Sequence, residues 1–539
     1  MSRSHRPDSN QLFFSNFRWL CNEELQRKLR STPFDVDALE GIACHAVGAQ
    51  RCISWSVLGE GGFNKVFLLN FDNDATAVVR LPSLATGNVE LATASEVATM
   101  CYVRESLEYE RLDKQPLPPR VLAWNASHQN PAGTPYIILE YVSGVPLDAR
   151  WYRVDFEGES AGAPMVNVAI LEYCLLHDPL SQNGALFFAL DVVDKLPNCP
   201  LYRVPPTDDF RKRLSEKYRI GPTVDREWWR GDYARVEANR GPWPDMQTMI
   251  KSAAEFQLRA IDTVVDFSSP LVVSKSSDIP LLRRMLETCI RIAPHVVPDD
   301  LLLTVPVLNH PDRSLANLIV EPEGLAWVRG IIDWQGTTVS PFFMQCGMPS
   351  AFRYDGELIK IPEDGSLPPW PEHFDELSPE EQDFVRVQHR LACRHRGYMG
   401  SIANQDPARL FALTEPSLEA VANLPLLITR CAADGPRELR DTLIRIQLYW
   451  DRYSDSPCPI GFSQEEIAAH VAEENDFKVW NAARYRVLRE IQCRIDGAVH
   501  ADRFEEAKEI MERCRKEWDE SEMKGPFPLY EGAHSYTIT

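Results

Sequence analysis

The sequence predicts an α+β protein in which a small strand-rich part precedes a large, mainly helical part. Strand-favouring runs separated by turn residues fill much of residues 54–142, and helical spacing of apolar residues dominates residues 380–518. Between them, residues 150–306 are less periodic and rich in Trp, Arg and Pro. A chain of 539 residues is too long for one compact core, so we expect at least two lobes.

The composition excludes several classes of protein. Acidic residues outnumber basic ones by 78 to 57, and the formal net charge of -21 disfavours nucleic acid and anionic membrane surfaces as partners. No run of 18 apolar residues occurs, so we expect no transmembrane segment. The 13 cysteines form no C-x-x-C pair, which argues against a disulfide framework or a zinc site and favours a reducing compartment.

The N-terminus carries a faint targeting signal. Arg3, Arg6 and Arg18, with several serines between them, are typical of a mitochondrial transit peptide. The acidic residues Asp8 and Glu23 count against one, as does Glu24. The sequence therefore predicts a cytoplasmic or mitochondrial protein.

Residues 308–336 form the most informative segment. His310, Asp312 and Asn317 make the pattern H-x-D-x-x-x-x-N, and two short apolar runs joined by a turn then lead to Asp333. A hairpin of that length returns Asp333 to the neighbourhood of Asp312 and Asn317. We therefore expect two carboxylates and an amide to converge.

Phosphoryl transfer from a nucleotide needs such a set, because a hard cation must hold the phosphates while the acceptor hydroxyl is oriented. In this interpretation Asp312 orients and deprotonates the acceptor, and Asn317 and Asp333 hold Mg²⁺. The alternative is a loop of helix-capping Asp and Asn residues with an incidental His.

The segment resembles the catalytic and metal-binding loops of the aminoglycoside phosphotransferase family, in which D-W commonly stands where protein kinases have D-F-G. The resemblance implies a bilobal protein-kinase-like fold, with a small β-rich N-lobe and a large, mainly helical C-lobe. It also implies ATP and Mg²⁺ as cofactors, Asp312 and His310 as catalytic-loop residues, and a small-molecule hydroxyl as acceptor. It covers residues 54–147 and 305–347 best.

A glycine cluster lies between two strand-favouring runs near the start of the predicted N-lobe. Glycines let a turn bring backbone N–H groups close to phosphates. The alternative is an ordinary hairpin turn, because the cluster matches neither the Walker A pattern nor a strict G-x-G-x-x-G before a helix. The residues expected to contact nucleotide are Gly59, Gly61, Gly62, Phe63 and Asn64.

The resemblance places two charged residues next to this turn. Arg80 ends the strand at 76–81, where a kinase-like N-lobe presents a phosphate-binding lysine. An arginine is always charged and forks across two oxygens, so it could take that role with different geometry. Glu96, in the helical segment 91–109, is its expected partner, although it could equally be a solvated glutamate.

The run at residues 135–142 ends in a Gly and Pro break and looks like the hinge between lobes. The resemblance implies that the backbone from Glu140 to Val142 binds an adenine ring. A buried strand ending in a turn would give the same pattern, and the two interpretations are compatible.

The expected organisation is an N-terminal extension at 1–53 packed on the N-lobe, the N-lobe at 54–143 and the helical C-lobe at 144–539, with an insertion at about 150–300. The insertion and the N-terminal F-R-W-L run resemble a large fungal branch of the same family, the group that includes the altered-inheritance-of-mitochondria proteins. His177, Asp178 and His295 lack a nucleophile or metal spacing and are expected to be structural.

The leading prediction is a Mg·ATP-dependent phosphotransferase that acts on the hydroxyl of a small molecule. The alternative from another class is a catalytically inactive kinase-like protein that binds nucleotide or partners, which the arginine at position 80 motivates. A protein kinase fits less well, because no A-P-E segment follows Asp333. The acceptor, the choice between ATP and GTP, and the oligomeric state do not follow from the sequence.

Overall fold

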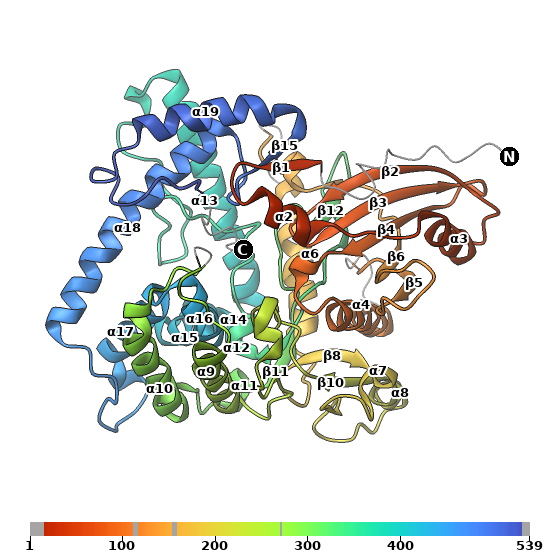
Figure 1. The fold of residues 1–539 in the computed structure, drawn as a ribbon, viewed down its shortest axis with the longest axis horizontal. Coiled ribbons are helices and arrows are strands. Elements are labelled where there is room, and N and C mark those ends of the chain that lie inside the picture. The colour runs from red at the N-terminus through yellow and green to blue at the C-terminus, as the bar shows by residue number, and fades with distance from the viewer. Residues whose placement is uncertain (1–15, 111–116, 154–158, 270–271, 531–539) are drawn as a thin grey trace.

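The computed structural model describes residues 16–110, 117–153, 159–269 and 272–530 (Figure 1). A small lobe built on an antiparallel sheet lies beside a larger, helical lobe, as the predicted α+β, kinase-like fold class requires. The fold class is confirmed by this arrangement of elements. The boundaries at residues 53 and 143 stay predictions.

The N-lobe is a five-stranded sheet in the order β2-β3-β4-β6-β5. All neighbouring strands are antiparallel, and a long helix, α4, connects β4 to β5. The elements are β2 (Cys52–Glu60), β3 (Asn64–Phe71), β4 (Thr76–Pro82), η1 (Leu84–Thr86), α4 (Val89–Glu110), β5 (Val121–Asn125) and β6 (Tyr136–Glu140).

Alternation along the strands decides what each face of this sheet contacts. Phe67 and Val79 lie in a core shared with α3 (Val36–Val47), on one face of the sheet. Val78 packs instead with the cluster that contains α4. Successive side chains of a strand point to opposite faces, so Arg80 faces α4 as Val78 does.

The start of the C-lobe is tied to the predicted hairpin. β12 (Leu318–Val320) pairs with β13 (Val328–Ile331), and on its other side with the short strand β7 (Val145–Pro146). Gly144 has a φ of +148°, and a Cβ there would stand 2.6 Å from the carbonyl oxygen of Val320. Only glycine fits this turn, which brings the chain leaving the N-lobe onto the β12–β13 hairpin.

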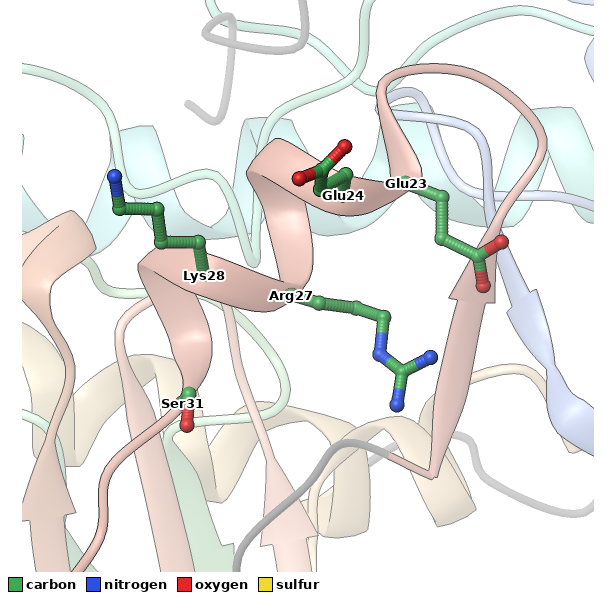
Figure 2. A pocket seen from close by; sticks show the side chains of 5 residues that line it. All are labelled: Glu23, Glu24, Arg27, Lys28 and Ser31. Atoms are coloured by element: carbon green, nitrogen blue, oxygen red, sulfur yellow. The ribbon is translucent and has the colours of Figure 1, made fainter.

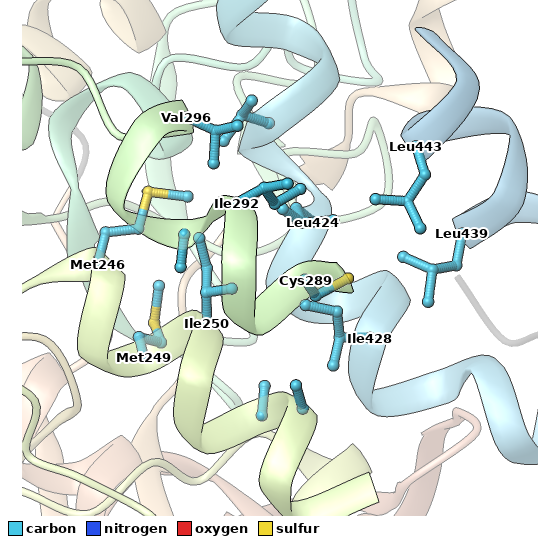
Figure 3. Packing of buried hydrophobic residues seen from close by; sticks show 14 of the residues in the cluster. Met246, Met249, Ile250, Cys289, Ile292, Val296, Leu424, Ile428, Leu439 and Leu443 are labelled. Atoms are coloured by element: carbon cyan, nitrogen blue, oxygen red, sulfur yellow. The ribbon is translucent and has the colours of Figure 1, made fainter. Parts of the chain in front are cut away.

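Helices fill the rest of the C-lobe around a buried apolar core (Figure 3). Met249 and Ile250 of α9, Ile292 of α10 and Ile428 of α16 meet there. The elements are α5 (Asp148–Trp151), α6 (Glu159–Leu176), α9 (Met246–Thr263), η4 (Ser276–Asp278), α10 (Ile279–Val296), α11 (Leu301–Thr304), β11 (Pro306–Leu308), β14 (Val339–Pro341), α12 (Phe342–Gln345), η5 (Phe374–Glu376), α13 (Pro379–Gln405), α14 (Pro407–Thr414), α15 (Pro416–Ala422), α16 (Leu424–Asp434), α17 (Arg437–Leu448) and η6 (Trp450–Arg452).

The insertion forms its own small three-stranded sheet in the order β8-β10-β9. Ala185 and Phe187 of β8 pack against Ala94 of α4, so the insertion covers the helix that carries Glu96. Its elements are β8 (Ala185–Phe188), α7 (Ala189–Val192), β9 (Cys199–Pro200), α8 (Asp209–Lys217), β10 (Tyr218–Gly221), η2 (Arg226–Trp228) and η3 (Gly231–Arg235).

The two ends of the described chain lie together. β1 (Phe17–Trp19) pairs with β15 (Ala498–His500), and Leu20 and Cys21 share a core with α18 and α19. The predicted extension is therefore divided: α3 packs on the N-lobe sheet, whereas β1 joins the C-terminal elements. The C-terminal elements are α18 (Gln464–Ile491), η7 (Ala501–Arg503) and α19 (Phe504–Glu517), and the extension also contains α2 (Glu23–Arg30). The first arginines of the candidate transit peptide lie outside the described residues.

Of the helices in the described part of the chain, none combines the length and the apolar content that crossing a membrane requires.

Candidate active site

Asp312 and Asn317 are joined directly in the loop before β12. The Asn317 side-chain N–H group donates to Asp312 Oδ2 at 2.8 Å and to the Asp312 carbonyl oxygen at 3.0 Å. Because its nitrogen makes these bonds, the amide of Asn317 keeps its oxygen as an acceptor or metal ligand. Ser314 Oγ also donates to Asp312 Oδ2, at 3.2 Å.

Asp333 returns to this loop through the hairpin, as the sequence predicts. The backbone N–H of Ile332 donates to the carbonyl oxygen of Asn317 at 3.1 Å, which fixes the residue before Asp333 against Asn317. Asp333 itself has a φ of +69°, a left-handed conformation that non-glycine residues seldom adopt. Its side chain is 45% exposed. The two carboxylates and the amide therefore lie at one end of the hairpin.

The surroundings of Asp312 raise the pKa of its carboxylate, mainly because they remove part of its hydration. Its side chain reaches solvent, but the groups packed around it raise its pKa, and the charge of Asp333 raises it further. The hydrogen bonds from Ser314 and Asn317 oppose this shift. A raised pKa makes a carboxylate a stronger proton acceptor.

His310 is a buried, neutral residue that shapes the loop. Its Nδ1 accepts the Asp312 backbone N–H at 3.2 Å, so Nε2 carries the proton and donates to the Ile332 carbonyl oxygen at 3.0 Å. Trp334 packs edge-on against the ring, with the ring centroids 4.5 Å apart. Burial lowers the pKa of His310 to about 3. These contacts hold the ring of His310 against the backbone of Asp312 and Ile332, and a catalytic role for His310 stays a prediction.

This lowered pKa predicts how stability depends on pH. Below pH 6.5 the unfolded chain protonates His310 while the folded chain does not until about pH 3, so stability falls across that window. Replacing the ring by a neutral amide, His310→Gln, should remove a loss of about 1.4 kcal/mol per pH unit between pH 6 and 4. Chemical unfolding at several pH values measures both slopes. Parallel slopes would show that His310 titrates normally in the folded protein.

Arg313, which sequence reasoning did not single out, connects the loop of Asp312 to α6. Its Nη1 lies 2.9 Å from Oε1 of Glu172 in α6, and Glu172 Oε2 lies 2.8 Å from Nη2 of Arg409 in α14. Glu172 is fully buried, and its second ion pair, with Arg409, connects the loop of Asp312 to two C-lobe helices. No sequence pattern marks these pairs, because the partners lie on segments that are far apart along the chain.

Arg80 makes the expected contact with Glu96 and a further contact with Asp333. Its Nη1 pairs with Glu96 Oε1, and its Nη2 lies 2.5 Å from Asp333 Oδ1. Only 7% of the Arg80 side chain is exposed. Burial raises the pKa of Glu96 to about 7 against the attraction of Arg80. One guanidinium thus bridges the helix α4 and the predicted metal ligand.

Gln335, directly after the D-W pair, is a second residue that sequence reasoning missed. Its Oε1 accepts from Asn64 Nδ2 at 2.8 Å and from Arg80 Nη2 at 3.3 Å, and its Nε2 donates to Thr86 Oγ1 at 3.5 Å. It connects the glycine turn, the basic strand end and η1 to the segment that carries Asp333. The sequence offers one indication of this role, which is that Gln335 lies two residues after the predicted metal ligand Asp333.

The glycine cluster forms the predicted turn between β2 and β3. The Gly61 N–H donates to the Asn64 carbonyl oxygen at 3.0 Å, which closes a tight turn. Neither Gly59 nor Gly61 has a left-handed backbone. Among the described atoms, none lies within 4 Å of a Cβ built on Gly59, and the nearest to one on Gly61 is the Asn64 carbonyl oxygen at 4.0 Å. Neither backbone strain nor packing against the described residues therefore requires glycine at these two positions, and their contact with nucleotide stays a prediction.

The predicted hinge lies between the N-lobe sheet and the β12–β13 hairpin. The Glu140 N–H donates to the Arg120 carbonyl oxygen at 2.9 Å, so it is not the donor to an adenine. Arg104 and the Arg120 N–H hold the Glu140 carboxylate, at 2.5 Å and 2.8 Å. Val142 packs against Gly330 of β13, where a Cβ would stand 3.1 Å from its methyl group. An adenine at this hinge would have to use other backbone groups of residues 140–142 than the Glu140 N–H.

The donor set at the hairpin fits Mg²⁺ bound together with a nucleotide. In the described part of the chain, no group of three or more His, Cys, Asp or Glu side chains is placed to hold a metal ion by itself. The Asn317 amide oxygen and the Asp333 carboxylate are hard oxygen ligands, and Mg²⁺ commonly takes one or two protein oxygens and completes its shell with phosphate and water. The residues present therefore fit this ion.

A surface pocket of about 680 Å³ lies apart from the predicted site (Figure 2). One side of α2 lines it, with acidic and basic side chains side by side. This mixed charge gives it no preference for an anionic or cationic ligand. The predicted site residues meet at the β12–β13 hairpin and not at this pocket. The lining residues are Glu23, Glu24, Arg27, Lys28 and Ser31.

No family model matches the chain. A subtelomeric hrmA-associated cluster protein of Aspergillus fumigatus is 27% identical over 502 residues, covering 86% of this chain and 93% of that protein. Altered inheritance of mitochondria protein 9, mitochondrial, of Yarrowia lipolytica is 23% identical over 508 residues, 89% of this chain and 84% of that protein. Its Candida albicans counterpart is 23% identical over 542 residues, 89% of this chain and 83% of that protein.

Among solved structures, a thermostable mutant of the aminoglycoside phosphotransferase APH(4)-Ia matches with a TM-score of 0.32 and 15% identity, over 73% of this chain and 98% of that chain. Spectinomycin phosphotransferase APH(9)-Ia matches with a TM-score of 0.32 and 11% identity, over 79% and 96%. A likeness at TM-scores this low carries no argument about this chain. The sequence matches confirm that the chain resembles the fungal proteins related to altered inheritance of mitochondria protein 9.

Proposed function

We propose that this protein is a Mg·ATP-dependent phosphotransferase that transfers the γ-phosphate to a hydroxyl group of a small molecule. One observation carries the proposal: Asp312, Asn317 and Asp333 lie at one end of the hairpin, on the side from which Arg80 reaches Asp333. A base, two oxygen ligands and a cation are the protein groups that phosphoryl transfer requires.

Each side chain then has a distinct task. Asp312 accepts the proton of the acceptor hydroxyl and orients its oxygen toward the phosphate, and His310 and Arg313 fix its loop. Asn317 and Asp333 would hold Mg²⁺, which supplies positive charge to the phosphate oxygens. Arg80 would hold the phosphates from the N-lobe side, and Glu96 keeps it in place.

The experiment that tests this function is a metabolite-library screen. Purified protein is incubated with Mg·ATP and pooled alcohols, and phosphorylated products are identified by mass spectrometry beside the Asp312→Asn variant as control. A product that forms only with the wild-type chain is the expected result. ATP turnover that does not differ between the two chains would contradict the assignment of Asp312.

A second candidate is a nucleotide-binding scaffold without catalysis. The 2.5 Å contact between Arg80 Nη2 and Asp333 Oδ1 favours it, because it engages the carboxylate that a metal ion would need. Both candidates predict that Mg·nucleotide raises the melting temperature. Only the enzyme turns the nucleotide over, so turnover separates them.

We also propose that this protein is located in mitochondria, since the relatives from Yarrowia lipolytica and Candida albicans are named as mitochondrial. A fusion with a C-terminal fluorescent tag, imaged with a mitochondrial dye, distinguishes mitochondria from cytoplasm.

Arg80→Lys tests whether Arg80 and Mg²⁺ compete for Asp333. A lysine has one ammonium group and cannot bridge Glu96 and Asp333 as the guanidinium does. We expect the Mg²⁺ concentration for half-maximal nucleotide binding to fall by about threefold to tenfold, from a free-energy change of about 1 kcal/mol for a released pair. A magnesium titration at fixed nucleotide measures it. A higher magnesium requirement would show instead that the forked guanidinium assists binding.

A further inference from the structure

The insertion reaches the glycine turn through one side chain, Arg226 of η2. Arg226 Nε donates a hydrogen bond to the carbonyl oxygen of Ala85 at 2.8 Å. Its guanidinium carbon lies 5.3 Å from the centre of the Phe63 ring, within the range at which an aromatic face attracts a cation. Arg226 therefore contacts both η1 and the glycine turn.

The insertion approaches η1 closely at Gly87. This glycine has a φ of +94°, and a Cβ there would stand 3.3 Å from Trp229 Cβ and 3.5 Å from Arg226 Cα. A side chain at this position would strain the backbone and push η2 away. The contact of Arg226 with Ala85 is thus supported by close packing of the two segments.

The segment that Arg226 contacts is itself bonded to the glycine turn. The carbonyl oxygen of Phe63 accepts from the Ser83 N–H at 2.8 Å and from Thr86 Oγ1 at 3.3 Å. Thr86 Oγ1 in turn accepts from Gln335 Nε2 at 3.5 Å. A continuous set of contacts thus runs from the insertion, through η1, to the segment that carries Asp333.

Arg226 also has charged neighbours, one in its own segment and one on α2. The Glu227 carboxylate of the same segment lies 3.7 Å away and is closer to Arg230, at 3.0 Å. Burial lowers the pKa of Arg30 on α2, and the charge of Arg226 acts in the same direction, so a second arginine lies within electrostatic reach. The ion pair connects Arg226 to its own segment, whereas the contacts with Phe63 and Ala85 connect it to the N-lobe.

We propose that Arg226 is a positioning residue of the nucleotide site: it holds Phe63 against η1 and so sets how closely the glycine turn approaches the phosphates of a bound nucleotide. The inference rests on the proposed function, because it needs a nucleotide at that turn. It gives the insertion a role, which is to control the phosphate end of the site and not the adenine end.

The test compares Arg226→Ala with the matched control Arg235→Ala, in the same insertion but 81% exposed. Calorimetry measures the affinity of each full-length chain for Mg·AMP-PNP and for adenosine. We expect Arg226→Ala to weaken Mg·AMP-PNP on the order of tenfold and adenosine by less than about threefold, from the loss of one hydrogen bond and one cation–π contact. Arg226→Lys should recover part of the loss, and Arg235→Ala should match wild type.

Equal weakening for both ligands would overturn the proposal, because a general loss of structure acts on adenosine too. Unchanged affinity for both would also overturn it. Hydrogen exchange of residues 59–66 in nucleotide-free protein gives a second readout, in which faster exchange in Arg226→Ala alone is expected and unchanged exchange contradicts the proposal. If wild type binds no nucleotide, the proposed function fails, and this second readout still tests the contact.

Discussion

Asp312→Asn should abolish most turnover while nucleotide binding remains. The amide keeps the shape of the carboxylate and can still contact Asn317 and Ser314, but it cannot accept a proton from the acceptor hydroxyl. General-base catalysis contributes about 10²- to 10⁴-fold, so kcat should fall by that factor. The measurement is the rate of product formation with saturating Mg·ATP and acceptor.

The matched control for this variant is Asp355→Asn, because the Asp355 side chain is 80% exposed. Among the ion pairs of the described residues, this substitution affects only the 4.0 Å pair of Asp355 with Arg353. The control should retain the wild-type rate. Nucleotide affinity of Asp312→Asn should stay within about threefold of wild type, since no phosphate contact is removed. A variant that turns over at the wild-type rate would show that Asp312 is not the base.

Asp333→Asn should remove the dependence of nucleotide affinity on Mg²⁺. The carboxylate is the charged member of the proposed ligand pair, and a neutral amide binds a hard cation more weakly. We expect affinity for Mg·AMP-PNP to fall at least about tenfold, or about 1.4 kcal/mol, while affinity for metal-free nucleotide changes little. Calorimetric titrations with and without magnesium measure both values.

Folding of Asp333→Asn needs its own check, because Arg80 loses one of its two carboxylate partners. Glu96 remains paired with Arg80, so the variant should still unfold cooperatively. If magnesium improves nucleotide affinity equally in the variant and in wild type, the metal is held elsewhere and the assignment of Asp333 is wrong.

The convergence at the hairpin could be predicted because it is local. Asp312, Asn317 and Asp333 all lie within the single segment 308–336, and strand pairing of β12 with β13 returns one end to the other. Arg80 could be oriented toward α4 by strand alternation alone, once its strand was recognised. Local sequence patterns were therefore enough to predict that Asp312, Asn317 and Asp333 converge and that Arg80 faces α4.

Contacts between distant segments could not be predicted. Arg313 meets Glu172 of α6, and Arg226 of the insertion meets Phe63 of the glycine turn. Each of these residues has an ordinary local sequence, and their partners are set by tertiary packing of the insertion and of α6. The split of the N-terminal extension has the same cause, because β1 pairs with β15 from the opposite end of the chain.

A crystal structure of the wild-type chain grown with Mn²⁺ and AMP-PNP tests the central claim most directly, because Mn²⁺ substitutes for Mg²⁺ and is identified by anomalous scattering. We predict an anomalous peak about 2.2 Å from both the Asn317 amide oxygen and an Asp333 carboxylate oxygen, with the γ-phosphate facing Asp312. A manganese ion bound away from these residues, with the nucleotide far from the β12–β13 hairpin, would contradict the account.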